Sequence, residues 1–225
     1  MNAPNLEKIE LKTGSHAKRE DGVCAMELVA WMAGEKHSDA PECACPVITK
    51  YVIRLNDRLT TEERQLLKPY LPRIIGTRDT SENQIKRAKT LAHAALTVFA
   101  PMALEVRGYK DHAEKMRAIP MSTSSQEWLE ARDIARDAAA DAAADAADAA
   151  YAAAYAAAAA AAADAAADAD ADADAAAAAA YAAAYAAAAA AADADADADA
   201  AAARKPVVEQ ALKYLDEILK VGKRD

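Results

Sequence analysis

The sequence predicts an all-α protein: a compact N-terminal helical domain, then long Ala/Asp-rich helices, then a C-terminal amphipathic helix. Three observations support this prediction. Apolar residues recur every three or four positions between residues 85 and 106, as they do on one face of a helix. Residues 131–203 contain 52 Ala and 14 Asp, and alanine has the highest helix propensity. Helical apolar spacing returns over residues 208–219.

We divide the chain into an irregular lead-in at residues 1–21, a helical domain at 22–120, an Ala/Asp-rich helical segment at 121–203 and an amphipathic helix at 204–225. The lead-in shows no periodicity apart from a short extended piece at residues 9–11. Nothing else about its structure is predicted.

The first helix is expected over residues 23–33, which read VCAMELVAWMA, with Gly34 supplying a left-handed cap. This stretch is apolar on nearly every side, so the helix should be buried. Glu27 is its only carboxylate. Because an unpaired buried charge is costly, Glu27 needs a partner inside the fold. A second helix should begin at Pro46, since proline suits the first helical position.

A short helix is expected to follow a cap at Thr60 and Thr61, and to be interrupted at Pro69 and Pro72 because proline has no N–H to donate. Gly76 should close it.

The best-defined core helix starts at Ser81, and its stripe of apolar residues predicts a kink at Pro101. After Pro120, a serine should cap the first Ala/Asp-rich helix.

The Ala/Asp-rich segment places aspartates and tyrosines in one helical sector and contains an internal repeat. Aspartates at every second residue in 168–174 and 193–199 would surround a helix with like charge, so we expect breaks there. Unbroken, the segment would reach about 110 Å, so we expect it to fold back or assemble. The sector contains Asp133, Asp137, Asp141, Asp145 and Asp148, continued by Tyr151 and Tyr155, and the repeat matches these tyrosines to Tyr181 and Tyr185.

The C-terminal helix should begin at Lys205 and Pro206, and presents Val208, Leu212, Leu215 and Leu219 on one face. Such a face needs a partner. Two alternatives remain: it docks on the N-terminal domain of its own chain, or it forms a dimer.

The charge is unevenly distributed. The net charge is −9, residues 131–203 carry −12, and the rest of the chain carries +3. Basic residues of the helical domain alternate with acidic ones, so we do not expect direct nucleic-acid binding. No long apolar run suggests a membrane span, and three cysteines cannot all pair, so we expect a soluble cytoplasmic protein in a reducing setting.

Cys24, His37, Cys43 and Cys45 are the only soft-ligand cluster and could form a structural zinc site. The favoured alternative is structural, because CAC places adjacent cysteines closer than the usual CxxC. In that alternative the thiols are buried or lie in a loop, and His37 forms a turn with Asp39. No other cofactor is expected.

Catalytic motifs are absent from the sequence. It has no GxGxxG, Walker loop, HExxH or GxSxG pattern. A nucleophilic pair of Cys24 and His37, oriented by Asp39, would require an activated thiolate. We instead expect Glu27 and Asp39 to be buried polar groups, with Glu27 paired to His37.

The sequence contains the runs KTGSH, DGVCAMELVAWMAGEKHSDAPECACPVI, RLNDRL, LPRIIGT and FAPMALEVRG. Together these five runs resemble an uncharacterised family of actinobacterial, proteobacterial and phage-encoded proteins. The resemblance covers roughly residues 11–108, and members often carry Ala-rich tails. It implies a mostly helical domain and a phage or prophage context, but no activity. The near absence of Arg and Trp from the Ala/Asp-rich segment departs from the family pattern.

The first functional hypothesis is therefore a non-enzymatic phage or prophage accessory protein. Its Ala-rich helices would mediate self-association, giving a homo-oligomer, or would bind a host protein. The tyrosines at 151, 155, 181 and 185 and the leucines at 212, 215 and 219 are the candidate interaction residues. The alternatives are an acidic DNA mimic that captures a host nucleic-acid-binding protein, a zinc-binding regulator or enzyme, and a solvated segment without a role.

Overall fold

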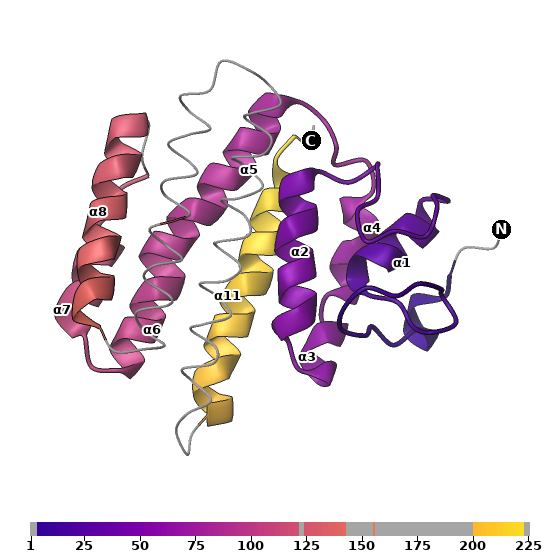
Figure 1. Ribbon diagram of the computed structural model, residues 1–225, viewed down its shortest axis with the longest axis horizontal. Coiled ribbons are helices and arrows are strands. Elements are labelled where there is room, and N and C mark those ends of the chain that lie inside the picture. Colours follow the sequence, from indigo (N-terminus) through magenta and orange to yellow (C-terminus); the bar gives the residue numbers. More distant parts are fainter. Residues whose placement is uncertain (1–3, 122–123, 143–154, 156–199, 223–225) are drawn as a thin grey trace.

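The computed structural model describes residues 4–121, 124–142, 155 and 200–222 of the chain (Figure 1). Over these residues the all-α prediction is confirmed. The only β-type pairing among them is one parallel bridge between Leu11 and Val23. The helices form one body, with α1 to α4 toward one end and α7 and α8 at the other.

The helix α1 (Ala25–Met32) lies within the predicted range of residues 23–33 but begins two residues later than expected, because Val23 pairs with Leu11 and Cys24 caps the helix. Cys24 and Glu27 form a reciprocal cap: the thiol accepts the N–H of Glu27, and the carboxylate accepts the N–H of Cys24. Gly34 follows the helix with φ of 75°. That left-handed conformation strains residues with a Cβ, so glycine suits the position.

The helix α2 (Pro46–Arg58) starts at the predicted proline. Its C-terminal carbonyls are satisfied by a buried cation, because the Arg64 guanidinium donates to the carbonyls of Asn56 and Leu59.

The short helix α3 (Thr61–Gln65) carries a capping box of Thr60 and Glu63. The chain then forms η2 (Lys68–Tyr70) and α4 (Leu71–Ile74), so the helix is interrupted around Pro69, as predicted. Pro72 does not interrupt it, because Pro72 lies in the first turn of α4, where no intrahelical N–H is needed.

The long helical stretch from Ser81 contains a π turn. It is built from α5 (Ser81–Ala94), the π turn η3 (Ala95–Phe99) and α6 (Ala100–Val106). Pro101 cannot donate an N–H to the preceding turn. The Ala100 N–H bonds five residues back, to the Ala95 carbonyl. The distortion expected at Pro101 therefore lies in the turn before it.

Two further helices form a hairpin at the edge of the molecule. The helix α7 (Lys110–Arg117) contacts α6 and η3, and α8 (Ser125–Asp141) packs against α7 (Figure 1). Ser124 caps α8 through the N–H of Glu127, as the predicted serine cap requires.

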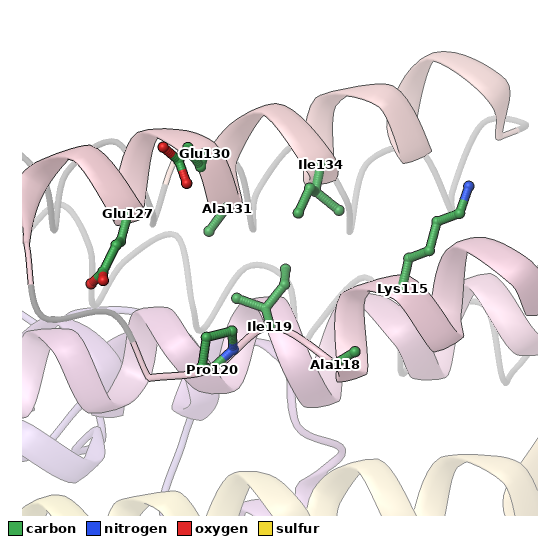
Figure 2. Close-up of a pocket in the computed structure, with 8 residues that line it drawn as sticks. All are labelled: Lys115, Ala118, Ile119, Pro120, Glu127, Glu130, Ala131 and Ile134. Carbon is green, nitrogen blue, oxygen red and sulfur yellow. The ribbon is translucent and has the colours of Figure 1, made fainter.

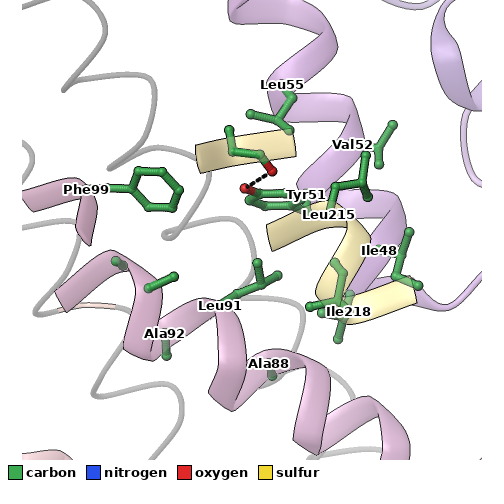
Figure 3. Close-up of a cluster of buried hydrophobic side chains, with 14 of the residues drawn as sticks. Ile48, Tyr51, Val52, Leu55, Ala88, Leu91, Ala92, Phe99, Leu215 and Ile218 are labelled. Atoms are coloured by element: carbon green, nitrogen blue, oxygen red, sulfur yellow. Dashed lines mark hydrogen bonds between the residues drawn. The ribbon is translucent and has the colours of Figure 1, made fainter. Parts of the chain in front are cut away.

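The C-terminal helix α11 (Ala200–Lys220) packs against α2 and α5. Figure 3 shows Leu215 and Ile218 in the same cluster as Ile48, Tyr51 and Leu91. The Tyr51 hydroxyl donates to the Ala211 carbonyl at 3.1 Å. Of the two alternatives for this helix, docking on the chain's own domain is the one observed. Leu215 and Leu219 are fully buried in that core, and Leu212 is half-buried against it.

The start of α11 differs from the expectation. The helix begins at Ala200 and continues through Pro206, instead of starting at Lys205 and Pro206. Alanine favours helix strongly enough to extend it on the N-terminal side of the proline, at the cost of one hydrogen bond.

A buried arginine fixes the C-terminal end of α11. Arg87 is 1% exposed, pairs with both oxygens of Asp79, and donates to the carbonyls of Ile218 and Val221. Gly222 has φ of 83°, and a Cβ there would collide with the Asp79 and Asn83 side chains. A glycine is therefore required where the chain leaves the helix.

The two ends of the Ala/Asp-rich segment both pack on this domain. α8 and α11 contribute side chains to one hydrophobic core together with α1, α2, α5 and α6. The chain between them, residues 142–199, is thus attached to the domain at both ends. The predicted repeat at Tyr151, Tyr181 and Tyr185, Asp145, Asp148 and both predicted breaks lie outside the described residues.

Candidate functional site

A buried polar cluster surrounds Glu27, which needs partners because α1 is buried. Glu27 is 1% exposed, and its carboxylate accepts the backbone N–H of His16 at 2.6 Å and that of Cys24 at 2.7 Å. The His16 ring Nδ1 lies 2.9 Å from Glu27 Oε2. His37 Nε2 lies 3.7 Å from Oε1 and bonds the His16 carbonyl at 2.8 Å. The cluster fastens the lead-in to α1.

Burial alone raises the pKa of Glu27, but hydrogen bonds from the His16 and Cys24 backbone and the His16 ring outweigh it, so the pKa is lowered. The carboxylate is therefore held in its charged form. Its main partner is His16, and His37 is the more distant one.

The thiol of Cys24 is unsuited to nucleophilic chemistry. Burial, reinforced by the Glu27 charge, raises the pKa of Cys24 to about 12 against hydrogen bonds that favour the thiolate. A nucleophilic cysteine needs a lowered pKa. The hypothesis of a nucleophilic pair of Cys24 and His37 therefore lacks the activated thiolate that it requires. Asp39, expected to orient His37 and to be buried, is half-buried, and His37 bonds the His16 carbonyl instead.

Cys43 and Cys45 contact other residues than Cys24 does. Glu35 accepts the N–H of Cys43, and burial followed by the Glu35 interaction raises the pKa of the Cys43 thiol to about 11. Cys45 is buried before α2, and its N–H donates to the Thr77 hydroxyl.

The predicted zinc ligands Cys24, His37, Cys43 and Cys45 do not converge in the structure. In the described part of the chain, no three His, Cys, Asp or Glu side chains are arranged to hold a metal ion. All three cysteines are free thiols.

The described beginning of the Ala/Asp-rich segment has two different faces. On α8 the alanine face is buried, whereas the aspartate face is exposed. Asp133, Asp137 and Asp141 follow the spacing that the sequence predicts, and Asp141 also accepts from His112 on α7 at 3.0 Å. Tyr155 is helical and exposed. The buried alanines are Ala131, Ala135, Ala138 and Ala139.

A groove of about 560 Å³ runs between α7 and α8 (Figure 2). Ile119 and Ile134 face each other across it, with Ala131 beside them. Lys115 stands toward one end, while Glu127 stands toward the other. This groove, together with the two faces of α8, is the candidate functional site. It offers a binding surface.

Comparisons with protein-family models, curated proteins and solved structures find no match to this chain. None of the helices within the described ranges is long and apolar enough to cross a membrane.

Two features of the polar cluster and the groove are not predicted from the sequence: the role of His16 and the helix α7. His16 lies in the lead-in and was not assigned to Glu27, although it is in the KTGSH run. The helix α7 was not predicted separately, yet Gly108 with φ of 86° ends the preceding helix, and Ala113 and Met116 have helical spacing.

Proposed function

We propose that this chain is a non-enzymatic phage or prophage accessory protein that acts by binding. Its Ala/Asp-rich helices would pack against helices of a second copy or of a host protein. The observation that carries the proposal is the division of α8 into a buried alanine face and a solvated aspartate face. The phage or prophage context is supported by the resemblance of residues 11–108.

Alanine faces are suited to helix pairing because small side chains let two backbones approach closely, and dispersion contacts then provide the attraction. Exposed aspartates keep the opposite face in water. Because the aspartate faces of two such helices repel each other, the helices can contact each other only through their alanine faces. Residues 143–199 are also rich in Ala and Asp, but with a different spacing: 149–163 and 175–192 contain no aspartate, whereas 168–174 and 193–199 have one at every second position.

The attachment of this segment at both ends decides how it must be tested. A C-terminal truncation would remove α11, and with it Leu215, Ile218 and Leu219 of the core. Such a protein would fail for reasons unrelated to binding. The informative variant deletes residues 143–199 and joins α8 to α11 by a flexible linker.

The experiment measures the mass of the full chain and of this internal deletion by light scattering after size exclusion. The proposal expects the full chain to form a larger assembly than the deletion variant, or to recover a partner from host lysate that the deletion variant does not. Trp31 and Trp128 lie outside the deleted residues, so their fluorescence checks that the domain is folded. Equal subunit numbers together with equal recovery would remove the proposal.

A second candidate function, an acidic decoy for a nucleic-acid-binding protein, is favoured by the exposure of the aspartates on α8. Regularly spaced carboxylates could imitate backbone phosphates. Binding of this kind weakens steeply as salt rises. Recovery of a basic host protein at low but not at high ionic strength would support it, and failure to recover one at low ionic strength would reject it.

A further inference from the structure

The groove between α7 and α8 has an exposed apolar centre. Ile134 is 38% exposed, although it is large and apolar. Met121, which follows Pro120 at the linked end of the hairpin, is 48% exposed. Isolated exposed apolar residues are common on protein surfaces, but Ile134 lines a groove that Ala118 and Ile119 also line. The apolar centre of the groove is therefore a surface that another protein surface could cover.

The charged residues of the groove are divided between its two ends. Glu127 and Glu130 lie near the linked end, and Lys115 lies toward the open end of the hairpin (Figure 2). The Glu127 carboxylate accepts the N–H of Ser124, which fixes it at the start of α8. Glu130 accepts from Gln126 one turn earlier. The groove therefore has a negative end, an apolar centre and a positive end.

We propose that this groove is a two-fold interface with a second copy of the chain. In an antiparallel pairing, Ile134 of the two copies would meet at the centre. Lys115 of each copy would face Glu127 and Glu130 of the partner subunit. A two-fold axis brings one surface patch against itself, so the patch must be self-complementary. The opposite charges at the two ends meet that requirement, whereas a parallel pairing would place like charges together.

This inference rests on the proposed binding function and names one of its surfaces. The hairpin of α7 and α8 lies at the edge of the molecule, where a second copy can reach it (Figure 1). A stable interface usually buries about 800 Å² on each partner. Eight lining residues provide less than that, so the dimer should be weak and concentration-dependent.

The test is sedimentation equilibrium of the full chain over a concentration series. Ile134→Arg should lower the association constant about tenfold or more, because it places a charge in the apolar centre. Since Ile134 is exposed, the variant should keep the wild-type unfolding midpoint, which tryptophan fluorescence checks. Glu114→Lys is the control, because Glu114 is exposed on α7 and does not line the groove.

A charge exchange makes the test specific to the antiparallel pairing. Lys115→Glu and Glu130→Lys should each weaken association, and the double variant should recover most of it. The proposal is overturned if the wild type is monomeric throughout, if Ile134→Arg associates like the wild type, or if the double variant is no better than the single ones.

The same measurements separate this proposal from the preceding one. If Ile134→Arg weakens association and deletion of residues 143–199 does not, the groove is the interface and the role of the segment in self-association fails. If only the deletion weakens association, the groove proposal fails and the segment retains its role.

Discussion

The substitution Leu215→Ala tests whether α11 is an integral part of the domain core. Leu215 is completely buried beside residues of α2 and α5 (Figure 3). Burying a leucine contributes about 1.5–3 kcal/mol, and the cavity left by truncation brings the total loss to about 2–5 kcal/mol. The free energy of unfolding of a domain is about 5–15 kcal/mol, so the loss should be a large fraction of it.

Two substitutions on the same helix calibrate this result. Leu212 is half-buried, so Leu212→Ala should cost less than Leu215→Ala. Glu209 is exposed, and Glu209→Ala should change the free energy of unfolding by about 0.5 kcal/mol or less. The predicted order of destabilisation is therefore Leu215, then Leu212, then Glu209.

The assay is denaturant unfolding followed by tryptophan fluorescence. Trp31 and Trp128 are the only tryptophans, and residues 143–199 contain none, so the signal reports on the helical domain. If α11 instead dimerised through these leucines, the effect of Leu215→Ala would depend on protein concentration. Equal midpoints for Leu215→Ala and Glu209→Ala, or a loss seen only at high concentration, would refute docking.

Three further predictions follow from single contacts. Arg87→Met should cost about 3 kcal/mol or more, because it leaves Asp79 and the carbonyls at the end of α11 without their buried donor; Lys86→Met, at an exposed neighbour, should have little effect in the same unfolding assay. Glu27→Gln should be less stable than the wild type at neutral pH, and the difference should close as pH falls below about 5. The reason is that the native pKa of Glu27 lies below its ordinary 4.5, so its stabilisation is present above that value and is lost as pH falls through the native pKa; a constant difference in unfolding midpoint from neutral to acidic pH would contradict this. Alkylation of Cys24 and Cys43 by iodoacetamide at neutral pH, followed by mass spectrometry, should be slow in the native protein and fast after unfolding, because burial raises both thiol pKa values; equal rates in the two states would rule it out.

The local signals in the sequence predicted several of the helix starts. Pro46, Thr60 and Ser124 stand where the observed helices begin, because capping and the restricted backbone of proline act within one turn. The requirement that Glu27 be satisfied was also predictable, since any charge on an apolar helix needs a partner.

The partner of Glu27 could not be chosen from the sequence, because that choice depends on how the chain folds back. His37 was expected, but His16 bonds the carboxylate through both its backbone and its ring. The leucine stripe of α11 was similarly ambiguous, because the same spacing suits docking and dimerisation. Contacts of Arg87 and Tyr51 with α11 join residues more than a hundred positions apart, and no local pattern encodes them.

The central claim is that α11 completes the same core as α2 and α5, so that the Ala/Asp-rich segment is attached to the domain at both ends. Hydrogen exchange of the full chain, read by mass spectrometry at two protein concentrations, tests this most directly. We predict that the amides of residues 211–219 exchange as slowly as those of α2, at either concentration. Exchange at the rate of an unprotected helix, or protection that disappears on dilution, would contradict it.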